Sequence, residues 1–419
     1  MLHFKDYQNK LSKFAKKNDL IIYGAGTLGK VACQMLKKLD IEVDFFCDSD
    51  QRKHNLKVEK KDIISPEKLQ SFEKDTDIFV CNIYFSSIVP FLKKSGFKNI
   101  YNSSQLFNDL DVNDFKIVKD EIYDDGKSIM APLKLKREID FYNEMSKKDA
   151  YINSDKLYVK TIDVQVTEKC SMKCKDCSNL MQYYTSPKDS DMDMMFRNIE
   201  KLMNCIDQLD EFRVLGGDPF MNKKLFKIIN KLTTYDNVNK IAIYTNAKIV
   251  PKGENLEALR HKKVLLDITN YGVTSTAHDK LVELCKNDNL LYRTTRCTTW
   301  QDCGRIMPYS NKSEPELKHL FNNCCNSDLV SLLHGKLYRC PFSANGVNLK
   351  AIPNNPKDEV DLNDESLSIK ELRDQIKNLC YEKEYLTACS FCNGRDYSTA
   401  NIPSAIQTKK PMEYQVIKD

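Results

Sequence analysis

Three cysteines, Cys170, Cys174 and Cys177, lie close together with the spacing C-x3-C-x2-C. Thiolates are soft ligands that suit iron–sulfur clusters, and three of them can hold three irons of a cubane [4Fe–4S] cluster. No fourth cysteine ligand follows nearby, so one iron would stay open to bind a small chelating molecule. A structural zinc site is the alternative, but zinc takes four closed ligands and its common motifs pair two C-x2-C knuckles. The spacing therefore favours a cluster that does chemistry.

A second set of four cysteines lies downstream, in the pattern C-x9-G-x4-C followed by a distant C-x2-C pair, and its members are Cys325, Cys340, Cys389 and Cys392. Four thiolates would fully ligate an auxiliary [4Fe–4S] cluster. Cys324 could replace Cys325, and Cys380 is a spare. Because four cysteines also suit zinc, a zinc site is the alternative interpretation of this set.

The composition indicates the class of protein in which these cysteines act. With 419 residues and an apolar fraction of 41%, the chain can form two or three ordinary domains. The net charge is only +5, and the scattered lysines argue against a dedicated nucleic-acid surface. No apolar run of about 18 residues occurs, so we expect no membrane span, and the start lacks the apolar core of a signal peptide. We therefore expect a cytoplasmic protein whose 16 cysteines serve metal or redox chemistry rather than disulfides.

Residues 1–110 predict a Rossmann-like α/β domain with a parallel sheet. Short apolar strands separated by helical periodicity are expected at 20–23, 43–47 and 78–81. Residues 111–158 are rich in charged side chains, and we interpret them as a connector with one helix near 134–147.

A Gly-x-Gly-x-x-Gly sequence, formed by Gly24, Gly26 and Gly29, follows the first of these strands. Its glycines would permit a tight turn and bring a phosphate close to a helix N-terminus. Asp48 stands about where a ribose-binding acid would be. The pattern predicts a dinucleotide site, and a Rossmann-like fold that binds no dinucleotide is the alternative, because fold does not fix function.

Residues 159–300 repeat strand–helix units whose strands end in polar residues. A strand with alternating apolar residues leads into the first cysteine loop. The strands that follow end in Gly216-Gly217-Asp218-Pro219, in Thr245-Asn246 and in Thr269-Asn270. Ligand groups collect at the carboxyl ends of the strands in barrels of this kind. The segment predicts a partial (β/α)6 barrel, followed over residues 301–419 by a small cysteine-rich domain and a tail.

These features resemble the radical S-adenosylmethionine (radical SAM) superfamily over about residues 160–395, more than half the chain. The resemblance implies that Cys170, Cys174 and Cys177 hold a [4Fe–4S] cluster whose open iron binds S-adenosylmethionine. Reductive cleavage would then release a 5′-deoxyadenosyl radical, which takes a hydrogen atom from substrate inside a dry pocket. A flavodoxin or ferredoxin would supply the electron.

The same resemblance assigns the polar strand ends to S-adenosylmethionine. The Gly-Gly-Asp-Pro turn is similar to the Gly-Gly-Glu-Pro turn of the family, in which the acid receives the ammonium group, and Asp218 is one methylene shorter than the usual Glu. Asp176 is a second departure, because many members carry an aromatic residue at that position. The implied cofactor-binding residues are Gly216, Gly217, Asp218, Pro219, Asn246, Thr269 and Asn270.

The second cysteine set resembles the SPASM/twitch extension of this superfamily. No cysteine follows Cys392, which favours the one-cluster twitch form. Between the two sets, Trp300 lies between Cys297 and Cys303. The tryptophan could stack on substrate, and Cys297 or Cys303 could donate a hydrogen atom. A packing tryptophan and two inert thiols are the alternative.

The N-terminal segment also looks like the small Rossmann-like domains attached to sugar-modifying proteins. Our first hypothesis is therefore the oxidation or epimerisation of a sugar or nucleotide-linked sugar, with the auxiliary cluster taking the second electron of an oxidation. A peptide or protein maturase of the same superfamily is the second hypothesis. A non-catalytic metal-binding module is the third.

Overall fold

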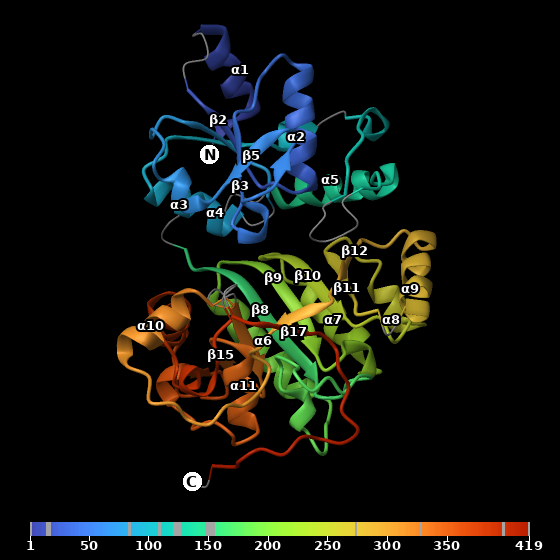
Figure 1. The fold of residues 1–419 in the computed structure, drawn as a ribbon, viewed down its shortest axis with the longest axis vertical. Coiled ribbons are helices and arrows are strands. Elements are labelled where there is room, and N and C mark those ends of the chain that lie inside the picture. Colours follow the sequence, from blue (N-terminus) through green and yellow to red (C-terminus); the bar gives the residue numbers. More distant parts are fainter. Residues whose placement is uncertain are drawn as a thin grey trace. The chain divides into compact units, whose positions relative to one another are not determined.

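A computed structural model describes residues 2–13, 18–82, 85–107, 110–119, 127–146, 156–272, 275–324, 326, 329–395 and 399–417. The chain divides into two compact units, Met1–Tyr158 and Val159–Asp419. Figure 1 draws the first unit in blue to teal and the second in green to red.

The first unit contains a sheet with the strand order β1-β7-β6-β2-β3-β5-β4. Its neighbouring strands pair in parallel except β4 and β5, which are antiparallel. The strands are β1 (Leu2–His3), β2 (Leu20–Tyr23), β3 (Phe45–Cys47), β4 (Lys57–Val58), β5 (Lys61–Ile64), β6 (Asp77–Val80) and β7 (Asn99–Asn102). The helices are α1 (Phe4–Lys13), α2 (Thr27–Lys38), α3 (Pro66–Leu69), α4 (Phe85–Lys94) and α5 (Pro132–Ser146).

The central strands β2 and β6 of this sheet are fully buried, as is usual when helices cover a parallel sheet. Every residue of β2 is buried, and the Phe79 ring meets Tyr7 edge to face and stacks on Tyr101. The predicted strands are found as β2, β3 and β6, and the predicted helix near 134–147 is α5. The parallel α/β class is thereby confirmed, whereas the Rossmann-like assignment and its nucleotide stay predictions.

The second unit contains a sheet with the strand order β12-β11-β10-β9-β8-β14-β15-β16. Its strands are β8 (Tyr158–Thr167), β9 (Gln208–Gly216), β10 (Val238–Thr245), β11 (Val264–Asn270), β12 (Tyr292–Arg296), β14 (Leu329–Leu333), β15 (Lys336–Tyr338) and β16 (Glu359–Asp361). A separate ribbon pairs β13 (Thr299–Gln301) with β17 (Asn401–Pro403). The helices are α6 (Met192–Cys205), α7 (Leu225–Thr233), α8 (Glu254–Ala258), α9 (Ser275–Asn287), α10 (Glu314–Asn322), α11 (Pro341–Asn348) and α12 (Ile369–Lys377).

Strands β9 to β12 pair in parallel and alternate with helices along the chain, and Figure 1 shows β8 to β11 running side by side. The predicted parallel strands are confirmed, and the arrangement as a partial (β/α)6 barrel stays a prediction. One feature was not predicted: β14, from the downstream segment, pairs in parallel with β8, with Val330 opposite Ile162. The hairpin formed by β14 and β15 therefore extends the same sheet across the boundary that we expected at residue 300.

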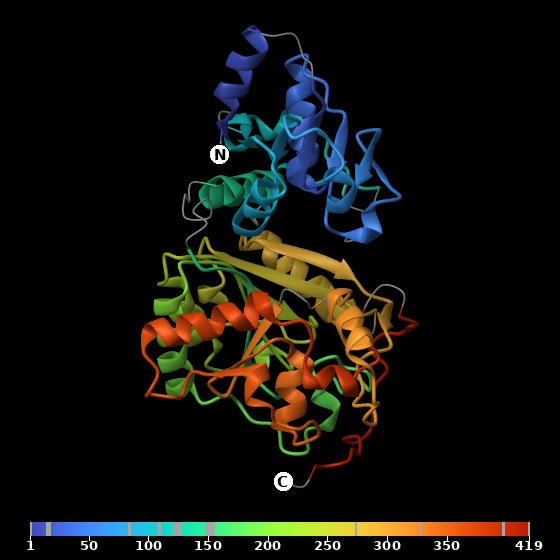
Figure 2. The same ribbon diagram turned by 90° about the vertical axis from the view of Figure 1, so that its left-hand side faces the viewer.

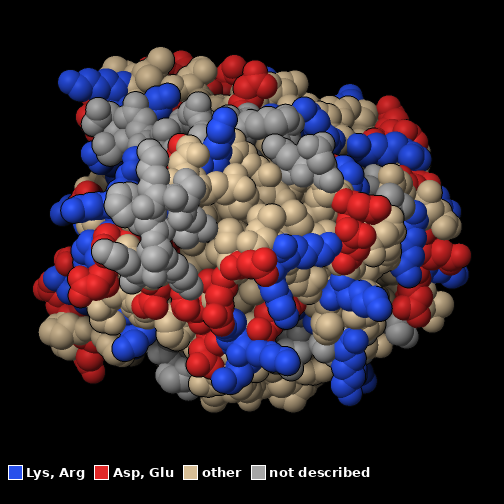
Figure 3. Space-filling view, turned by 90° about the horizontal axis from the view of Figure 1, so that it is seen from above, with Lys and Arg blue, Asp and Glu red and all other residues tan. Residues whose placement is uncertain are grey.

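The surface of the described residues has two properties that bear on partners. None of their helices is both long enough and apolar enough to cross a membrane. On the face drawn in Figure 3, lysines and arginines are interspersed with aspartates and glutamates. The absence of a nucleic-acid partner stays a prediction.

Candidate functional site

The first cysteine loop follows directly from the carboxyl end of β8. Cys170, Cys174 and Cys177 are all free thiols and half-buried. Burial raises the pKa of Cys174 to about 11 and raises the pKa of Cys170 and Cys177 above the ordinary thiol range. The neighbouring thiols Cys174 and Cys177 raise the pKa of Cys170 further. The structure thus brings the three predicted ligands together. Burial disfavours their thiolate forms, which a positively charged partner would stabilise.

The glycine turn after β9 packs directly against this loop. Gly217 donates its N–H to the Thr167 carbonyl oxygen at 2.9 Å, and a Cβ added at Gly217 would lie 2.1 Å from the Lys169 oxygen and 2.8 Å from the Cys170 Cβ. A Cβ at Gly216 would lie 2.1 Å from the Thr167 oxygen. Both predicted glycines are therefore required by the close approach of two backbones. They hold the cysteine loop against the end of β9.

Asp218 is fully buried in this turn and already has hydrogen-bond partners. Its Oδ1 accepts from the Phe220 N–H at 3.1 Å, and its Oδ2 accepts from the Thr245 hydroxyl at 2.8 Å and the Asn246 N–H at 3.0 Å. Burial raises the pKa of Asp218, and these hydrogen bonds oppose the rise. Three of about four acceptor positions are thus occupied. In this structure Asp218 fastens the turn to the end of β10, and its predicted contact with an ammonium group stays a prediction.

The end of β10 also contacts the cysteine loop. The Asn246 side-chain N–H lies 3.6 Å from Cys170 Sγ and 3.1 Å from Ser171 Oγ. Lys248 Nζ donates to the Ser171 carbonyl oxygen at 3.2 Å. Asn246 therefore lies beside Cys170, one of the predicted cluster ligands.

The end of β11 contributes an aromatic residue that the sequence analysis missed. Thr269 hydrogen-bonds Tyr271, and Asn270 Oδ1 accepts the Gly272 N–H at 2.8 Å. Burial raises the pKa of Tyr271, and the nearby thiols Cys297, Cys177 and Cys174 raise it further. The Tyr271 ring meets Trp300 edge to face at 5.5 Å. The two rings form one aromatic group near the first cysteine loop.

Asp176, just before the third cysteine, is buried and forms an ion pair with Arg305, whose side chain is partly exposed. A Cβ added at Gly304 would lie 2.0 Å from the Asp176 carbonyl oxygen. Where many radical SAM sequences carry an aromatic residue, this chain thus ties the cysteine loop to the segment that follows β13.

The second group of thiols comes from three segments of the chain. Burial raises the pKa of Cys340 and of Cys389. Cys324 and Cys392 add to the rise in both, and Cys340 adds to it in Cys389, so these four side chains lie near one another. Backbone N–H groups point at two of the sulfurs, because Ser343 donates to Cys340 and Gly394 donates to Cys392, each at 3.3 Å. Cys324 lies just after α10, and Cys325 lies outside the described residues.

Cys303 belongs to the surroundings of this second group. Burial raises its pKa to about 11, Arg395 opposes that rise, and Cys392 and Cys324 add to it. Its predicted role as a hydrogen-atom donor beside Trp300 stays a prediction. Cys297 is half-buried and donates to the Thr299 carbonyl oxygen at 3.4 Å.

One buried cation lies near both cysteine groups. Arg395 is only 6% exposed, follows Cys392 in the chain and donates from Nη2 to the Ser178 carbonyl oxygen at 3.0 Å, next to Cys177. Burial raises the pKa of Cys177 and of Cys340, and the Arg395 guanidinium opposes the rise in both. The guanidinium therefore favours the thiolate forms of both groups.

The donor sets fit iron–sulfur clusters. Among the described residues, no three His, Cys, Asp or Glu side chains converge closely enough to ligate one metal ion. A cubane cluster needs a different arrangement, because each of its irons takes its own thiolate. The three thiols of the first group and the four of the second are the donors that such clusters use.

In the first unit, the glycine sequence forms a tight turn after β2. A Cβ at Gly24, whose φ is +118°, would lie 2.6 Å from the Cys81 carbonyl oxygen, and a Cβ at Gly29 would lie 1.9 Å from the Gly24 oxygen. Gly26 has open space at that position. The outer two glycines are thus needed for packing, and the middle one faces space that a ligand could use.

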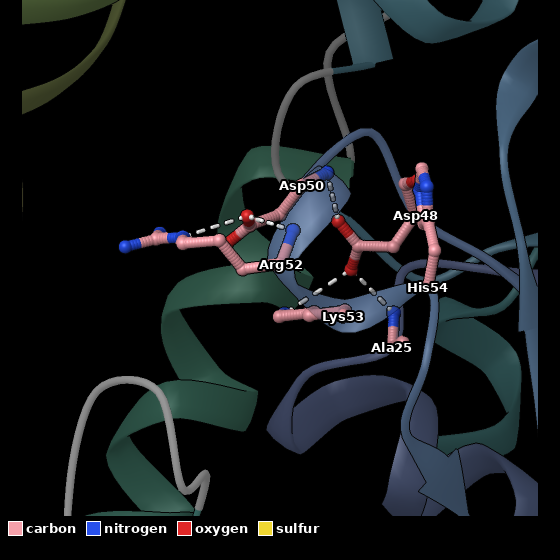
Figure 4. A network of polar contacts seen from close by, with 6 residues as sticks. All are labelled: Ala25, Asp48, Asp50, Arg52, Lys53 and His54. Atoms are coloured by element: carbon pink, nitrogen blue, oxygen red, sulfur yellow. Dashed lines mark hydrogen bonds and ion pairs between the residues drawn. The ribbon is translucent and has the colours of Figure 1, made fainter. Parts of the chain in front are cut away.

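Figure 4 shows how Asp48, after β3, is held. Its Oδ2 accepts from the Ala25 N–H at 2.9 Å and from Lys53 Nζ at 3.2 Å, and its Oδ1 accepts from the Asp50 N–H at 2.9 Å. The carboxylate fastens the glycine turn to the segment after β3. A pocket of about 350 Å³ opens beside this network, and its charged lining residues are Lys30, Lys53, Lys57, Glu59 and Lys119.

Comparison with known families separates the two units. Residues 163–290 match the family model described as a 4Fe-4S single cluster domain. The matched stretch contains the first cysteine loop and the Gly216-Gly217 turn. Residues 16–99 match a different model, described as C2185-like, N-terminal.

Curated relatives match less than a third of this chain. A GTP 3',8-cyclase of Staphylococcus epidermidis is 26% identical over 117 residues, which cover 26% of this chain and 34% of that protein. A GTP 3',8-cyclase of Helicobacter pylori is 26% identical over 132 residues, covering 31% of this chain and 39% of that protein. The chain thus spans just over a third of the length of these relatives.

Solved structures similar to the chain include BtrN in complex with AdoMet and 2-DOIA, with 15% identity and a TM-score of 0.34, covering 61% of this chain and 98% of that one. They also include anSMEcpe with bound AdoMet and the Kp18Cys peptide, with 11% identity and a TM-score of 0.36, covering 59% of this chain and 93% of that one.

Proposed function

We propose that this chain is a radical SAM enzyme that acts on a sugar or nucleotide-linked sugar. The observation that carries the proposal is the first cysteine loop, in which three half-buried thiols follow one strand and the Gly216-Gly217 turn packs against them. Such a loop leaves one iron of a cubane without a thiolate from the loop. The open iron is where S-adenosylmethionine would bind.

The residues around the loop have separate roles in this proposal. When bound, the cluster supplies the electron that cleaves S-adenosylmethionine to methionine and a 5′-deoxyadenosyl radical. Asn246 orients Cys170 through its side-chain N–H, and Asp218 fixes the ends of β9 and β10 in the same place. Tyr271 and Trp300 offer aromatic surfaces for adenine or substrate, and they keep water away from the radical. A flavodoxin or ferredoxin would deliver the electron.

The second group, with Cys340, Cys389, Cys392 and either Cys324 or Cys325, would hold an auxiliary [4Fe–4S] cluster. Its support is the electrostatic proximity of four thiols and the backbone N–H groups aimed at two of them. In an oxidation, such a cluster would accept the second electron after the hydrogen atom has left the substrate. In an epimerisation, a thiol would return the hydrogen atom instead.

Two observations support a nucleotide-linked sugar as substrate. The first unit holds a parallel sheet with a glycine turn, an open position at Gly26 and a lysine-lined pocket, which are properties suited to a phosphorylated ligand. The curated relatives described above are named for a reaction of GTP, which is itself a nucleotide. We therefore place a nucleoside diphosphate sugar first among the substrates to be tried.

The decisive experiment begins with anaerobic reconstitution of iron and sulfide, followed by addition of dithionite and S-adenosylmethionine. We expect about eight irons per chain and formation of 5′-deoxyadenosine. About four irons per chain together with cleavage of S-adenosylmethionine would support the radical SAM enzyme and contradict the auxiliary cluster. Tightly bound zinc without cleavage would refute the proposed function.

The substrate is tested with a panel of nucleoside diphosphate sugars deuterated on the ring carbons. We expect one of them to transfer deuterium into 5′-deoxyadenosine and to raise its yield above the uncoupled background. Free sugars and peptides form the comparison set. Deuterium transfer from a peptide alone would point instead to a peptide or protein maturase.

A further inference from the structure

The C-terminal tail runs along the outside of the second unit, as Figures 1 and 2 show in red. It is fastened to the first cysteine loop by backbone hydrogen bonds. Lys175 donates its N–H to the Ile406 oxygen at 2.8 Å, and Thr408 donates its N–H to the Lys173 oxygen at 2.6 Å. Cys174 and Gln407 thus face each other in an antiparallel bridge. Residues 406–408 are therefore paired directly with the loop that carries the three thiols.

Within this bridge, the Gln407 side chain is held by three partners. Its Oε1 accepts the Lys173 N–H at 2.6 Å. Its Nε2 donates to the Ala405 carbonyl oxygen at 2.7 Å and to Cys174 Sγ at 3.1 Å. Because a backbone N–H holds the amide oxygen and a carbonyl holds the amide nitrogen, the amide has one orientation. That orientation directs an N–H donor at the sulfur.

The backbone turn beside Gln407 is also specifically shaped. Ala405 is 3% exposed and adopts a φ of +57°, in the left-handed region that side chains other than glycine rarely adopt. Such a conformation is strained and persists only where the surroundings determine it. The turn brings the Ala405 oxygen onto the Gln407 amide. The fold therefore fixes the position of the Gln407 side-chain N–H donor.

A donor aimed at a cluster sulfur changes the energy of the cluster's two redox states. An N–H bonded to a ligand sulfur stabilises negative charge there, and the reduced cluster carries more of that charge than the oxidised one. The hydrogen bond therefore favours reduction and raises the reduction potential. Cys170 receives the Met172 N–H from within the loop, whereas the donor to Cys174 comes from the end of the chain.

We propose that Gln407 is a positioning residue that raises the reduction potential of the first cluster through Cys174. This inference rests on the proposed function, because it requires a cluster at Cys170, Cys174 and Cys177. It adds a role for the tail that the radical SAM resemblance does not supply. The tail would set how readily the enzyme accepts the electron that starts its reaction.

Two variants of the reconstituted full chain test this. Gln407→Leu removes the donor, and Gln407→Glu keeps the acceptor for Lys173 while placing an acceptor opposite the sulfur. Because Gln407 is exposed on its outer side, neither change disturbs a buried core. The matched control is Thr408→Val, which alters the next side chain and keeps its backbone bond to Lys173.

The readout is the midpoint potential of the cluster whose electron paramagnetic resonance signal changes on addition of S-adenosylmethionine. We expect the potential to fall in Gln407→Leu and to fall further in Gln407→Glu, with Thr408→Val unchanged. At a fixed ambient potential, the reduced-to-oxidised ratio in Gln407→Glu should drop by about tenfold, which for one electron is about 59 mV.

Two results would overturn the inference. One is an equal potential in all four proteins, and the other is a shift in Thr408→Val as large as that in Gln407→Leu, which would assign the effect to the tail rather than to the sulfur contact. If Gln407→Leu fails to bind iron, the comparison of Gln407→Glu with the wild type decides alone. Failure of the proposed function is distinguishable, because the wild type would then show no such cluster signal.

Discussion

The two cysteine groups of the second unit are assembled in opposite ways. Cys170, Cys174 and Cys177 come from one loop after β8, whereas Cys340 and its partners come from three segments that meet only when α10, α11 and the helical turn at Thr387–Phe391 are packed. A local group keeps its spacing even when the surrounding structure loosens. A dispersed group exists only in the folded state. The comparison teaches that the first site depends on the few backbones that touch its loop, and the second on tertiary packing.

The largest effect is expected from removing the first group. In Cys170→Ala/Cys174→Ala/Cys177→Ala, we expect the iron content to fall by about half and 5′-deoxyadenosine to fall to background, because the open iron is lost. Iron assay and chromatography of the reaction measure both quantities. Cys33→Ala, in the first unit, is the control and should change neither. Undiminished cleavage in the triple variant would place the reactive cluster elsewhere.

Next in size is a single methyl group placed against the first loop. In Gly217→Ala, the added Cβ meets the Lys169 oxygen at 2.1 Å, so the loop must move away from β9. We expect loss of the first cluster and a stability cost of about 1–3 kcal/mol, the range for overpacking. Gly26→Ala is the matched control, because its Cβ meets nothing within 4 Å. Equal iron content and melting temperature in the two variants would contradict the contact described here.

Removing the second group should separate cleavage from turnover. In Cys389→Ala/Cys392→Ala, we expect about half of the iron to be lost while S-adenosylmethionine is still cleaved without substrate, because the first loop is intact. Product formation should be lost. Iron counting, 5′-deoxyadenosine and product are measured on one sample. Complete loss of cleavage would mean that the two groups do not act separately.

A smaller contrast distinguishes the two adjacent cysteines after α10. Cys324 is electrostatically near Cys340, Cys389 and Cys392, and if it is the fourth ligand, Cys324→Ala should reduce the occupancy of the second cluster more than Cys325→Ala does. Absorbance at the iron–sulfur charge-transfer band, normalised to protein, measures the difference. The reverse order would assign the fourth ligand to Cys325.

The smallest effect concerns β8, the strand that both regions share. Burial raises the pKa of Asp163 to about 6, with Arg213 and Arg395 opposing the rise and Glu211 adding to it. A carboxyl whose folded pKa is raised binds protons more tightly in the folded state. It therefore favours folding at low pH, and stability falls as pH rises from about 4 to about 6.

Asp163→Asn removes this titration. We expect the free energy of unfolding to decline less steeply across that interval in the variant than in the wild type, as measured by urea unfolding at several pH values. Since Asp163 forms an ion pair with Arg213 at 3.2 Å, the variant should also be less stable above pH 6. Identical slopes would show that Asp163 has the same pKa in both states.

Local sequence patterns predicted several strands and the surroundings of the first cysteine loop. Leu20–Tyr23 is the predicted strand, and the three cysteines and the Gly216-Gly217 turn lie together as expected. These features depend on spacing within short segments, which a sequence displays directly.

Contacts between distant segments could not be predicted in the same way. The bond from Gln407 to Cys174, the pairing of β14 with β8 and the position of Arg395 near both cysteine groups join residues far apart in the chain. No periodicity or spacing encodes them. Tyr271 was missed because a lone tyrosine after a strand carries no signal until its neighbours are known.

The pairing of β14 with β8 has a consequence for producing residues 159–300 alone. β8 is ten residues long and almost entirely buried, and β14 covers its outer side over four paired residues. A fragment ending at residue 300 would leave that side as a bare sheet edge with apolar faces. Such edges recruit strands from other molecules. The shortened fragment should therefore aggregate on expression. The segment that carries the second cysteine group thus also prevents self-association, because its strand β14 covers the edge of β8.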